Sequence, residues 1–206
     1  MKDNTLTPIT LAMTGASGAA YGLRLLECLL TAQRRVYFMI SDAARTVVKM
    51  ELGVELPADV SALENFLTER FAAERGQLKV FGNLDWLAPP ASGTGGKIPM
   101  VICPASGGVI SAIATGASTN LVQRAADVAI KEKRPLIIVP REMPASAIHL
   151  ENQLKLAHLG ATIMPASPGF YQNPRSLDDI VDFVVARILD QLDISHNLLP
   201  RWGKTS

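Results

Sequence analysis

Apolar residues in this chain gather in short, nearly continuous runs, and polar residues separate one run from the next. Runs of this kind predict buried strands, because a strand of a parallel sheet is covered on both faces and shows no polar alternation. Six runs have this pattern: Ile9–Met13, Val36–Ile40, Lys79–Phe81, Met100–Cys103, Pro135–Val139 and Ala161–Met164.

Between these runs, apolar residues recur at helical spacing, as Leu25, Leu26 and Leu29 do within 19–33. Strands that alternate with helices predict an α/β fold: a doubly wound, Rossmann- or flavodoxin-like parallel sheet of about six strands with helices on both faces. The further helices are expected from the cap at Ser41-Asp42 to Met50, from a Ser61–Glu64 capping box to Glu74, and over 109–115, 121–133, 146–159 and 176–192.

Length and charge narrow the class of protein. The 206 residues suit one domain, 1–206, with flexible ends expected at 1–8 and 203–206. The 20 basic and 19 acidic residues give a net charge of +1, which argues against a nucleic-acid partner or a membrane surface. No apolar run approaches the ~18 residues of a membrane span. Cys28 and Cys103 are expected to be reduced, packed thiols, and a cytoplasmic location follows.

The first strand stops at the small-residue turn Thr14-Gly15-Ala16-Ser17-Gly18, and a helix begins there. Glycines let a ligand approach the backbone, and the first N–H groups of a helix favour an anion. The glycine spacing through Gly22 differs from the dinucleotide motif G-x-G-x-x-G, and a tight turn without a ligand would also explain it.

The other strand ends add weight to a ligand site. In doubly wound sheets, ligands bind outside the carboxyl ends of the strands, where the strand order reverses. Small hydroxyl side chains, glycines and an arginine gather at these ends, at Ser41, Ser106-Gly107-Gly108, Arg141-Glu142 and 167–171. The combination favours a bound ligand over a bare turn.

Several chemistries can be compared on these residues. The histidines, His149, His158 and His196, are scattered without metal-site spacing, and none follows a strand, so Ser17 is expected to donate a hydrogen bond rather than act as a nucleophile. A nicotinamide dinucleotide could use Asp42 near the end of the second strand, although helix capping explains Asp42 equally well. FMN requires one phosphate site and a flat slot, which the turns at Gly15 and Gly107 can supply.

Two further features suggest a second ligand or a partner. Arg141, Arg187 and Tyr171 would suit a second phosphate, although a solvated ion pair and ordinary packing are the plainer interpretations. The long Gly/Pro-rich segment 82–99 carries Trp86 and is typical of a lid, a binding loop or an assembly arm.

Six stretches, in order and spacing, resemble the UbiX-type flavin prenyltransferases, a flavoprotein family formerly described as 3-octaprenyl-4-hydroxybenzoate carboxy-lyase. The resemblance covers nearly the whole chain: Met13–Gly18, Asp85–Gly93, Pro140–Glu142, His149–Asn152, Pro168–Tyr171 and Asp182–Arg187. It implies an enzyme that joins a dimethylallyl group from dimethylallyl monophosphate to N5 and C6 of reduced FMN. It also implies a UbiD-type decarboxylase as recipient of the prenylated FMN, a link to ubiquinone biosynthesis, and a homo-oligomer, a dodecamer.

The resemblance also assigns roles to residues. It implies that Tyr171 and Arg187 hold the prenyl phosphate, helped by Lys131 and Arg124 from a neighbouring subunit. The residues implied to act in catalysis are Ser17, Glu51, Glu142 and Trp86, with Trp86 as an apolar wall. The residues implied to contact FMN are Gly15, Ala16, Ser17, Ser41, Ser106, Gly107, Gly108, Val109 and Arg141.

The chain departs from some relatives at Ser106–Val109, which has fewer hydroxyl groups than a Ser-Thr-Gly-Thr sequence, so backbone contacts are expected there. No aspartate cluster for magnesium is present, and no metal is expected to be required. Arg187 is expected on the sheet-facing side of the last helix with Phe183 and Val184, where it needs a carboxylate or phosphate partner.

Two alternatives have different requirements. An FMN-dependent decarboxylase of the same fold superfamily, acting on peptidyl or pantothenoyl cysteine, would use a histidine on an early helix, and 21–30 contains none. A non-catalytic flavin carrier would need the FMN turns but would give no reason for Arg187 and Tyr171.

Overall fold

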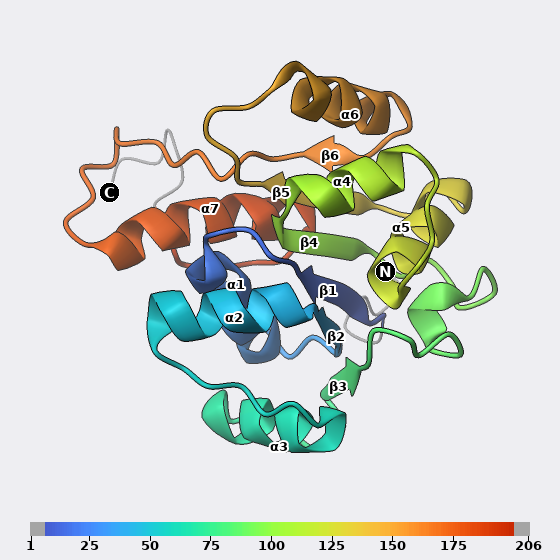
Figure 1. Ribbon diagram of the computed structural model, residues 1–206. Helices are drawn as coiled ribbons and strands as arrows, with labels where there is room; N and C mark the ends of the chain where they lie inside the picture. Colours follow the sequence, from blue (N-terminus) through green and yellow to red (C-terminus); the bar gives the residue numbers. More distant parts are fainter. Residues whose placement is uncertain (1–6, 200–206) are drawn as a thin grey trace.

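The computed structural model describes residues 7–199, and a parallel β-sheet runs through their centre (Figure 1). Within these residues the sheet has six strands in the order β3-β2-β1-β4-β5-β6, and every neighbouring pair is parallel. This confirms the predicted fold class. The strands are β1 Ile9–Met13, β2 Val36–Ile40, β3 Leu78–Phe81, β4 Met100–Ala105, β5 Leu136–Pro140 and β6 Thr162–Ile163.

The helices follow the predicted alternation, with ends set by local caps. Ser41 caps α2 by accepting a hydrogen bond from the Ala44 N–H, 3.1 Å long, and Gly53 ends that helix at φ +66°. The helices are α1 Ala19–Thr31, α2 Asp42–Leu52, α3 Val60–Arg70, α4 Gly107–Ala114, α5 Leu121–Lys131, α6 Ala147–His158 and α7 Leu177–Gln191, with a short 3₁₀ helix, η1, at Pro89–Ala91.

The predicted start of the third helix is wrong. Asp59, not Ser61, caps α3, and its Oδ1 accepts the Ala62 N–H at 2.8 Å. Glu64 is therefore not the partner in a capping box. Its carboxylate instead accepts the Val80 N–H at 2.9 Å, which ties α3 to the edge strand β3.

Two hydrophobic layers cover the sheet, one on each face. Phe38, Val101 and Val185 belong to the layer that contains residues of α1, α2, α3 and α7. Ile102, Ile138 and Leu156 belong to the opposite layer, made with α4, α5 and α6. Figure 1 shows α4 and α6 on one side of the strands and α1 and α7 on the other.

The order of the strands fixes where a ligand can bind. β1 and β4 are neighbours, yet α1 and α4, which follow them, cover opposite faces of the sheet. The two turns between these strands and their helices therefore diverge at the carboxyl edge of the sheet, and this is the arrangement that forms a ligand-binding crevice in doubly wound folds.

The segment 82–99 is anchored on α5 and on the turn that follows this helix, so it is not a free arm. Ala88 and Ala91 are buried, and Arg134 Nη2 donates hydrogen bonds of 2.8 Å to the carbonyl groups of both Ser92 and Gly93. Leu87, by contrast, is 97% exposed.

Two expectations concern other parts of the chain. Apart from Thr7 and Pro8, the ends expected to be flexible, 1–8 and 203–206, lie outside the described residues. In the described part of the chain, no helix has the length and apolar character needed to cross a membrane.

Candidate active site

Thr14 joins the two turns at the centre of the site. Its hydroxyl donates to the Pro104 carbonyl at 2.9 Å and accepts the Ser106 N–H at 2.8 Å. Thr14 is 1% exposed, so both hydrogen bonds are shielded from water. The end of β1 and the start of α4 are thus held in one fixed arrangement.

The amino terminus of α1 does not offer its N–H groups freely, contrary to the expectation. The Glu51 carboxylate, from the last turn of α2, accepts the N–H groups of Gly18 at 3.0 Å and Ala19 at 2.8 Å. The Ser17 hydroxyl donates to the same carboxylate. A carboxylate of the chain itself therefore occupies the position predicted for an anion.

These contacts decide the charge of Glu51. Burial raises the pKa of its carboxyl, but the hydrogen bonds from Ser17, Ala19 and Gly18 and the nearby charge of Arg141 outweigh burial, and the net pKa is below the ordinary value. Glu51 is therefore an ionised acceptor at neutral pH, bound to the Ser17 hydroxyl.

The amino terminus of α4 is open by comparison. Within residues 7–199, Ser106 is the N-cap of α4 and its side chain makes no capping hydrogen bond. No described atom lies within 4 Å of a Cβ built on Gly108. The first N–H groups of α4 are consequently the better placed of the two helix ends to bind an incoming ligand.

Gly15 serves packing as well as any ligand. A Cβ at this position would lie 2.6 Å from the Ala43 Cβ, so glycine is needed for α2 to approach the turn. Ser41, at the end of β2, is already used as the cap of α2, although its hydroxyl hydrogen can still be donated.

The side chain of Arg141 gives the most direct indication that a ligand binds at this site. Its Nε is buried and has no hydrogen-bond partner among the described residues. A buried guanidinium N–H without an acceptor is costly, and an oxygen or ring nitrogen of a ligand would satisfy it. An open helix terminus, a free Ser106 hydroxyl and an unsatisfied arginine at one sheet edge fit the polar atoms of FMN.

The structure adds one residue that the sequence interpretation set aside. His149, in the first turn of α6, lies beside the start of α4: a Cβ built on Gly107 would be 3.0 Å from His149 Nε2 and 3.4 Å from Glu142 Oε2. A sequence signal existed, because Ser146-x-x-His149 has the spacing of a helix cap and its N3 partner.

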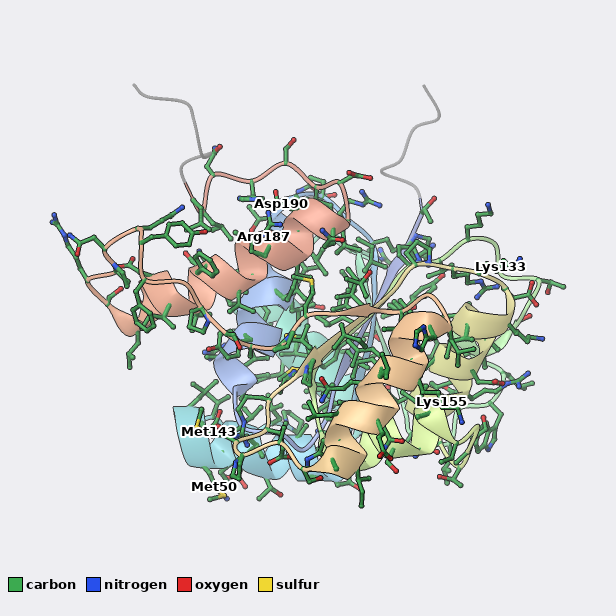
Figure 2. The ribbon with its side chains drawn as sticks, turned by 90° about the horizontal axis from the view of Figure 1, so that it is seen from above. Met50, Lys133, Met143, Lys155, Arg187 and Asp190 are labelled. Carbon is green, nitrogen blue, oxygen red and sulfur yellow. The ribbon has the colours of Figure 1, made fainter. Side chains whose placement is uncertain are left out.

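Tyr171 packs against α7, and Arg187 lies on that helix. The Tyr171 ring packs edge-to-face on Phe183 with centroids 5.6 Å apart, and Arg187 lies one turn beyond Phe183. The expected sheet-facing position of Arg187 is wrong, because its side chain is 51% exposed and its Nη1 is bonded to Asp190. Figure 2 shows that pair near the end of α7, well separated from Met50 and Met143, the neighbours of Glu51 and Glu142.

The remaining predicted residues lie on or near α5. Arg124 is paired with Asp127 at 3.0 Å and Lys131 with Glu132 at 3.4 Å. Lys131 ends the helix that precedes β5, so it lies toward the amino edge of the sheet, opposite Ser106 and Arg141. Trp86, in the segment packed on α5, is 46% exposed. One copy of the chain therefore does not bring Lys131 to the carboxyl edge.

The cysteines are free thiols, as expected. Burial raises the pKa of Cys28 to about 11 and raises that of Cys103 as well. Among residues 7–199, no three His, Cys, Asp or Glu side chains gather in the manner of metal ligands.

Comparison with known proteins gives this site a context. The chain matches the model of the Flavoprotein family over residues 1–189. Flavin prenyltransferase UbiX of Pseudomonas aeruginosa is 61% identical over 196 residues, which make up 95% of this chain and 94% of that protein.

Solved structures agree with the sequence comparison. One is AnUbiX (PadA1) in complex with FMN and dimethylallyl pyrophosphate, with a TM-score of 0.84, 34% identity, and coverage of 97% of this chain and 99% of that one. Another is a dodecameric FMN-dependent UbiX-like decarboxylase from Escherichia coli O157:H7, with a TM-score of 0.82, 36% identity, and coverage of 96% and 100%.

Proposed function

Because the chain belongs to the family of UbiX flavin prenyltransferases, we propose that it joins a dimethylallyl group from dimethylallyl monophosphate to N5 and C6 of reduced FMN. The observation that carries this proposal to the chain's own residues is the buried Arg141 Nε, which lacks an acceptor among the described residues at the carboxyl end of β5, the strand next to β4. Reduced FMN supplies the two nucleophilic positions that receive the allyl group.

The flavin would be held at the carboxyl edge of the sheet. Arg141 and the start of α4 would donate hydrogen bonds to its polar atoms, and the Ser41 hydroxyl would add another. The residues proposed to contact FMN are Gly15, Ala16, Ser17, Ser41, Ser106, Gly107, Gly108, Val109 and Arg141. This set comes from four strand ends, those of β1, β2, β4 and β5, which suits a flat ligand lying across the edge.

The prenyl donor needs a different set of groups. Breaking the bond between the allyl carbon and the phosphate oxygen leaves negative charge on phosphate, which cations stabilise. Arg187 and the Tyr171 hydroxyl would bind this phosphate, and Arg124 and Lys131 of a second copy would add charge. Trp86 would exclude water from the allyl carbon. The separation of Arg187 from Glu51 and Glu142 in one chain supports a site built between copies.

Proton balance explains the need for acid–base groups. Forming bonds at N5 and C6 of the flavin releases two protons, one from each position. One proton is added to the allyl double bond, and the other leaves with the phosphate. Glu51 is ionised and bonded to Ser17, so this pair would accept and return a proton near the β1 turn. Glu142, next to Arg141, would act as the second acid–base group.

The partners follow from the same proposal. The prenylated FMN would be passed to a UbiD-type decarboxylase, in a pathway such as ubiquinone biosynthesis. The assembly would be a closed homo-oligomer, a dodecamer of single-domain chains 1–206, in the cytoplasm. No metal ion would be required, because arginine, lysine and tyrosine side chains bind the phosphate.

The test is anaerobic incubation with reduced FMN and either dimethylallyl monophosphate or dimethylallyl pyrophosphate, followed by mass spectrometry of the flavin. The proposal predicts a mass gain of one isoprene unit with the monophosphate. A bound but unmodified flavin would favour a non-catalytic flavin carrier, and loss of CO₂ from a peptidyl or pantothenoyl cysteine would favour the decarboxylase alternative. Titration should also show FMN binding without NAD or NADP binding.

A further inference from the structure

His149 uses one of its ring nitrogens, Nδ1, and its backbone N–H to cap α6. Nδ1 accepts the Ser146 N–H at 3.2 Å, and the backbone N–H of His149 donates to Ser146 Oγ at 3.3 Å. These two hydrogen bonds close the cap of α6. Because Nδ1 is an acceptor, the hydrogen of the neutral ring is assigned to Nε2. The cap leaves Nε2 free to donate in another direction.

Nε2 points toward the candidate active site. Both His149 Nε2 and Glu142 Oε2 lie within 3.4 Å of the point where a Cβ of Gly107 would stand. Glycine at the first residue of α4 therefore lets the imidazole and the carboxylate converge. Any larger residue at 107 would come between them.

Beside the two side chains lies a small, partly open cavity of about 10 Å³, lined by Ala105, Gly107, Ile110, Pro140, Glu142, His149 and Gln153. A buried water molecule needs about this volume and two to four polar partners. The imidazole N–H, the carboxylate and the amide of Gln153 provide three. The cavity is therefore suited to one water molecule.

We propose that His149 is a positioning residue for Glu142, with Nε2–H donating to a water molecule in this cavity that in turn donates to the Glu142 carboxylate. This inference rests on the proposed function, in which Glu142 is an acid–base group. Holding one carboxylate oxygen fixes the rotamer of a side chain that is otherwise exposed. Proton transfer depends on such alignment, so kcat should respond more than substrate binding.

The variant that isolates this role is His149→Asn. In α7 of the same chain the short residue Asp179 closes the equivalent cap with Ser176, so a short amide at 149 can keep the cap of α6 while losing the donor in the cavity. The matched control is Ser146→Ala, which removes a cap hydrogen bond and keeps the imidazole. The assay measures prenyl transfer with FMN and donor titrations, beside thermal unfolding.

For His149→Asn, kcat should fall roughly tenfold, a part of the ~10²–10⁴-fold that a positioned acid–base group contributes. KM for the donor and Kd for FMN should stay within about twofold, and the same substitution should have no further effect in a Glu142→Gln background. Ser146→Ala should lower the unfolding temperature and keep kcat within about twofold.

Three results would overturn the proposal: unchanged kcat in His149→Asn, an equal loss of kcat in Ser146→Ala, or additive losses in the double variant. Wild-type kcat in Glu142→Gln would also overturn it, because the residue being positioned would then have no role. Absence of prenyl transfer in the wild-type protein would instead refute the proposed function itself, so the two failures are distinct.

Discussion

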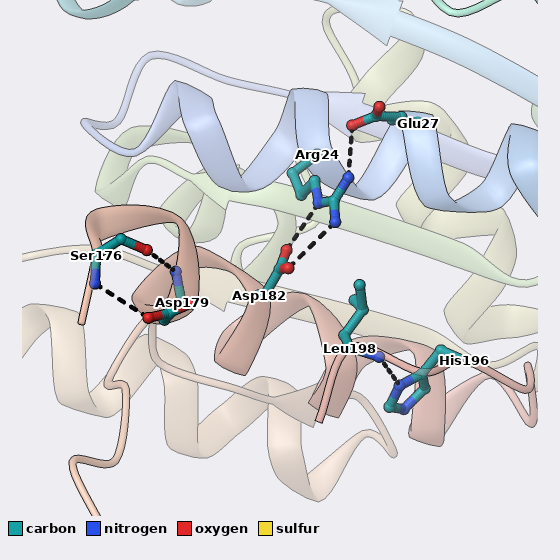
Figure 3. A network of polar contacts seen from close by, with 7 residues as sticks. All are labelled: Arg24, Glu27, Ser176, Asp179, Asp182, His196 and Leu198. Atoms are coloured by element: carbon teal, nitrogen blue, oxygen red, sulfur yellow. Dashed lines mark hydrogen bonds and ion pairs between the residues drawn. The ribbon is translucent and has the colours of Figure 1, made fainter. Parts of the chain in front are cut away.

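Arg24 of α1 donates two parallel hydrogen bonds to Asp182 of α7, 2.7 Å from Nε to Oδ1 and 3.1 Å from Nη2 to Oδ2 (Figure 3). The same guanidinium also donates to Glu27, on its own helix, at 2.8 Å. α1 begins at the β1 turn and α7 carries Arg187, so this contact joins the flavin side of the molecule to the helix proposed to bind the donor.

Asp182→Asn should lower the free energy of unfolding by about 1–2 kcal/mol, because it removes the negative charge of the partly buried carboxylate that accepts both hydrogen bonds from Arg24. The value is below that of a fully buried pair, since the side chains of Arg24 and Asp182 are 34% and 21% exposed. Urea denaturation at fixed protein concentration measures the change. Glu27→Gln is the control, with an expected loss below about 0.5 kcal/mol; equal losses would contradict the prediction.

Glu51→Gln should change the dependence of stability on pH. The folded-state pKa of Glu51 is below its ordinary value of 4.5, so its contribution is fully present above pH 4.5 and is lost as pH falls through the folded pKa. Because the Glu51 side chain is exposed and solvent screens its charge, the wild-type protein should exceed the variant by no more than about 0.5 kcal/mol at pH 7, and the difference should vanish in strong acid. Urea titrations at pH 7 and in strong acid measure this difference in the free energy of unfolding, with Glu55→Gln as the control variant. A difference that grows in acid would contradict the prediction.

Arg187→Ala should lose prenyl transfer and keep FMN binding. Loss of charge-assisted hydrogen bonds to phosphate should reduce kcat/KM for the donor by roughly tenfold or more. Flavin titration beside a single-turnover assay separates the two effects. Asp190→Asn is the matched control, because it releases the Arg187 guanidinium and should preserve or raise donor affinity. Unchanged turnover at subsaturating donor would make Arg187 structural, and a loss of flavin affinity alone would assign it to the flavin phosphate.

Gly169→Ala should weaken donor binding through Tyr171. The added Cβ would lie 2.6 Å from Tyr171 Cε1 and 3.0 Å from Phe183 Cζ, so the tyrosine ring must move off Phe183. Loss of such an aromatic pair costs about 0.5–1.5 kcal/mol, or up to about tenfold in donor KM. The effect should disappear in a Tyr171→Ala background. An undiminished effect there would show that Gly169 acts elsewhere.

Leu87→Lys should disturb assembly, because Leu87 is an almost fully exposed apolar side chain beside Trp86 on a segment anchored to α5. Light scattering at micromolar concentration should show a closed oligomer for the wild-type chain and smaller species for the variant. Lys97→Gln, an exposed change in the same segment, should leave assembly intact. A fully active wild-type monomer would refute the oligomer.

Much of the fold was predictable because burial on both sheet faces leaves a strong mark on strand sequences. Ile9–Met13 and Val36–Ile40 match the predicted strands at both ends. The start of α3 was predicted wrongly because two caps compete there, and a residue from another element, the Val80 N–H, binds the carboxylate of Glu64. Local spacing carries no information about such a distant contact.

The candidate site was predictable in place but less so in detail. The carboxyl ends of β1, β4 and β5 follow from topology, whereas the capping of α1 by Glu51 joins positions 33 residues apart and leaves no local pattern. The position of Arg187 could have been inferred, since Val184, Val185, Ile188 and Leu189 define the buried stripe of α7 and Arg187 falls outside it. Phe183, at the border of that stripe, was the misleading reference.

Thr14 connects the two turns that form the floor of the crevice. Its single hydroxyl group bridges the Pro104 carbonyl and the Ser106 N–H, so a movement of one turn requires the other turn to move with it. An isosteric valine would keep the shape of the side chain and the 3.1 Å hydrogen bond from the backbone N–H of residue 14 to the Pro104 carbonyl, but it would lose both hydroxyl contacts, including the one to the Ser106 N–H. The Ser106 amide, although it lies at the start of a helix, should therefore exchange its hydrogen with deuterated water only when the central strands part, which makes it a gauge of how tightly the floor is closed.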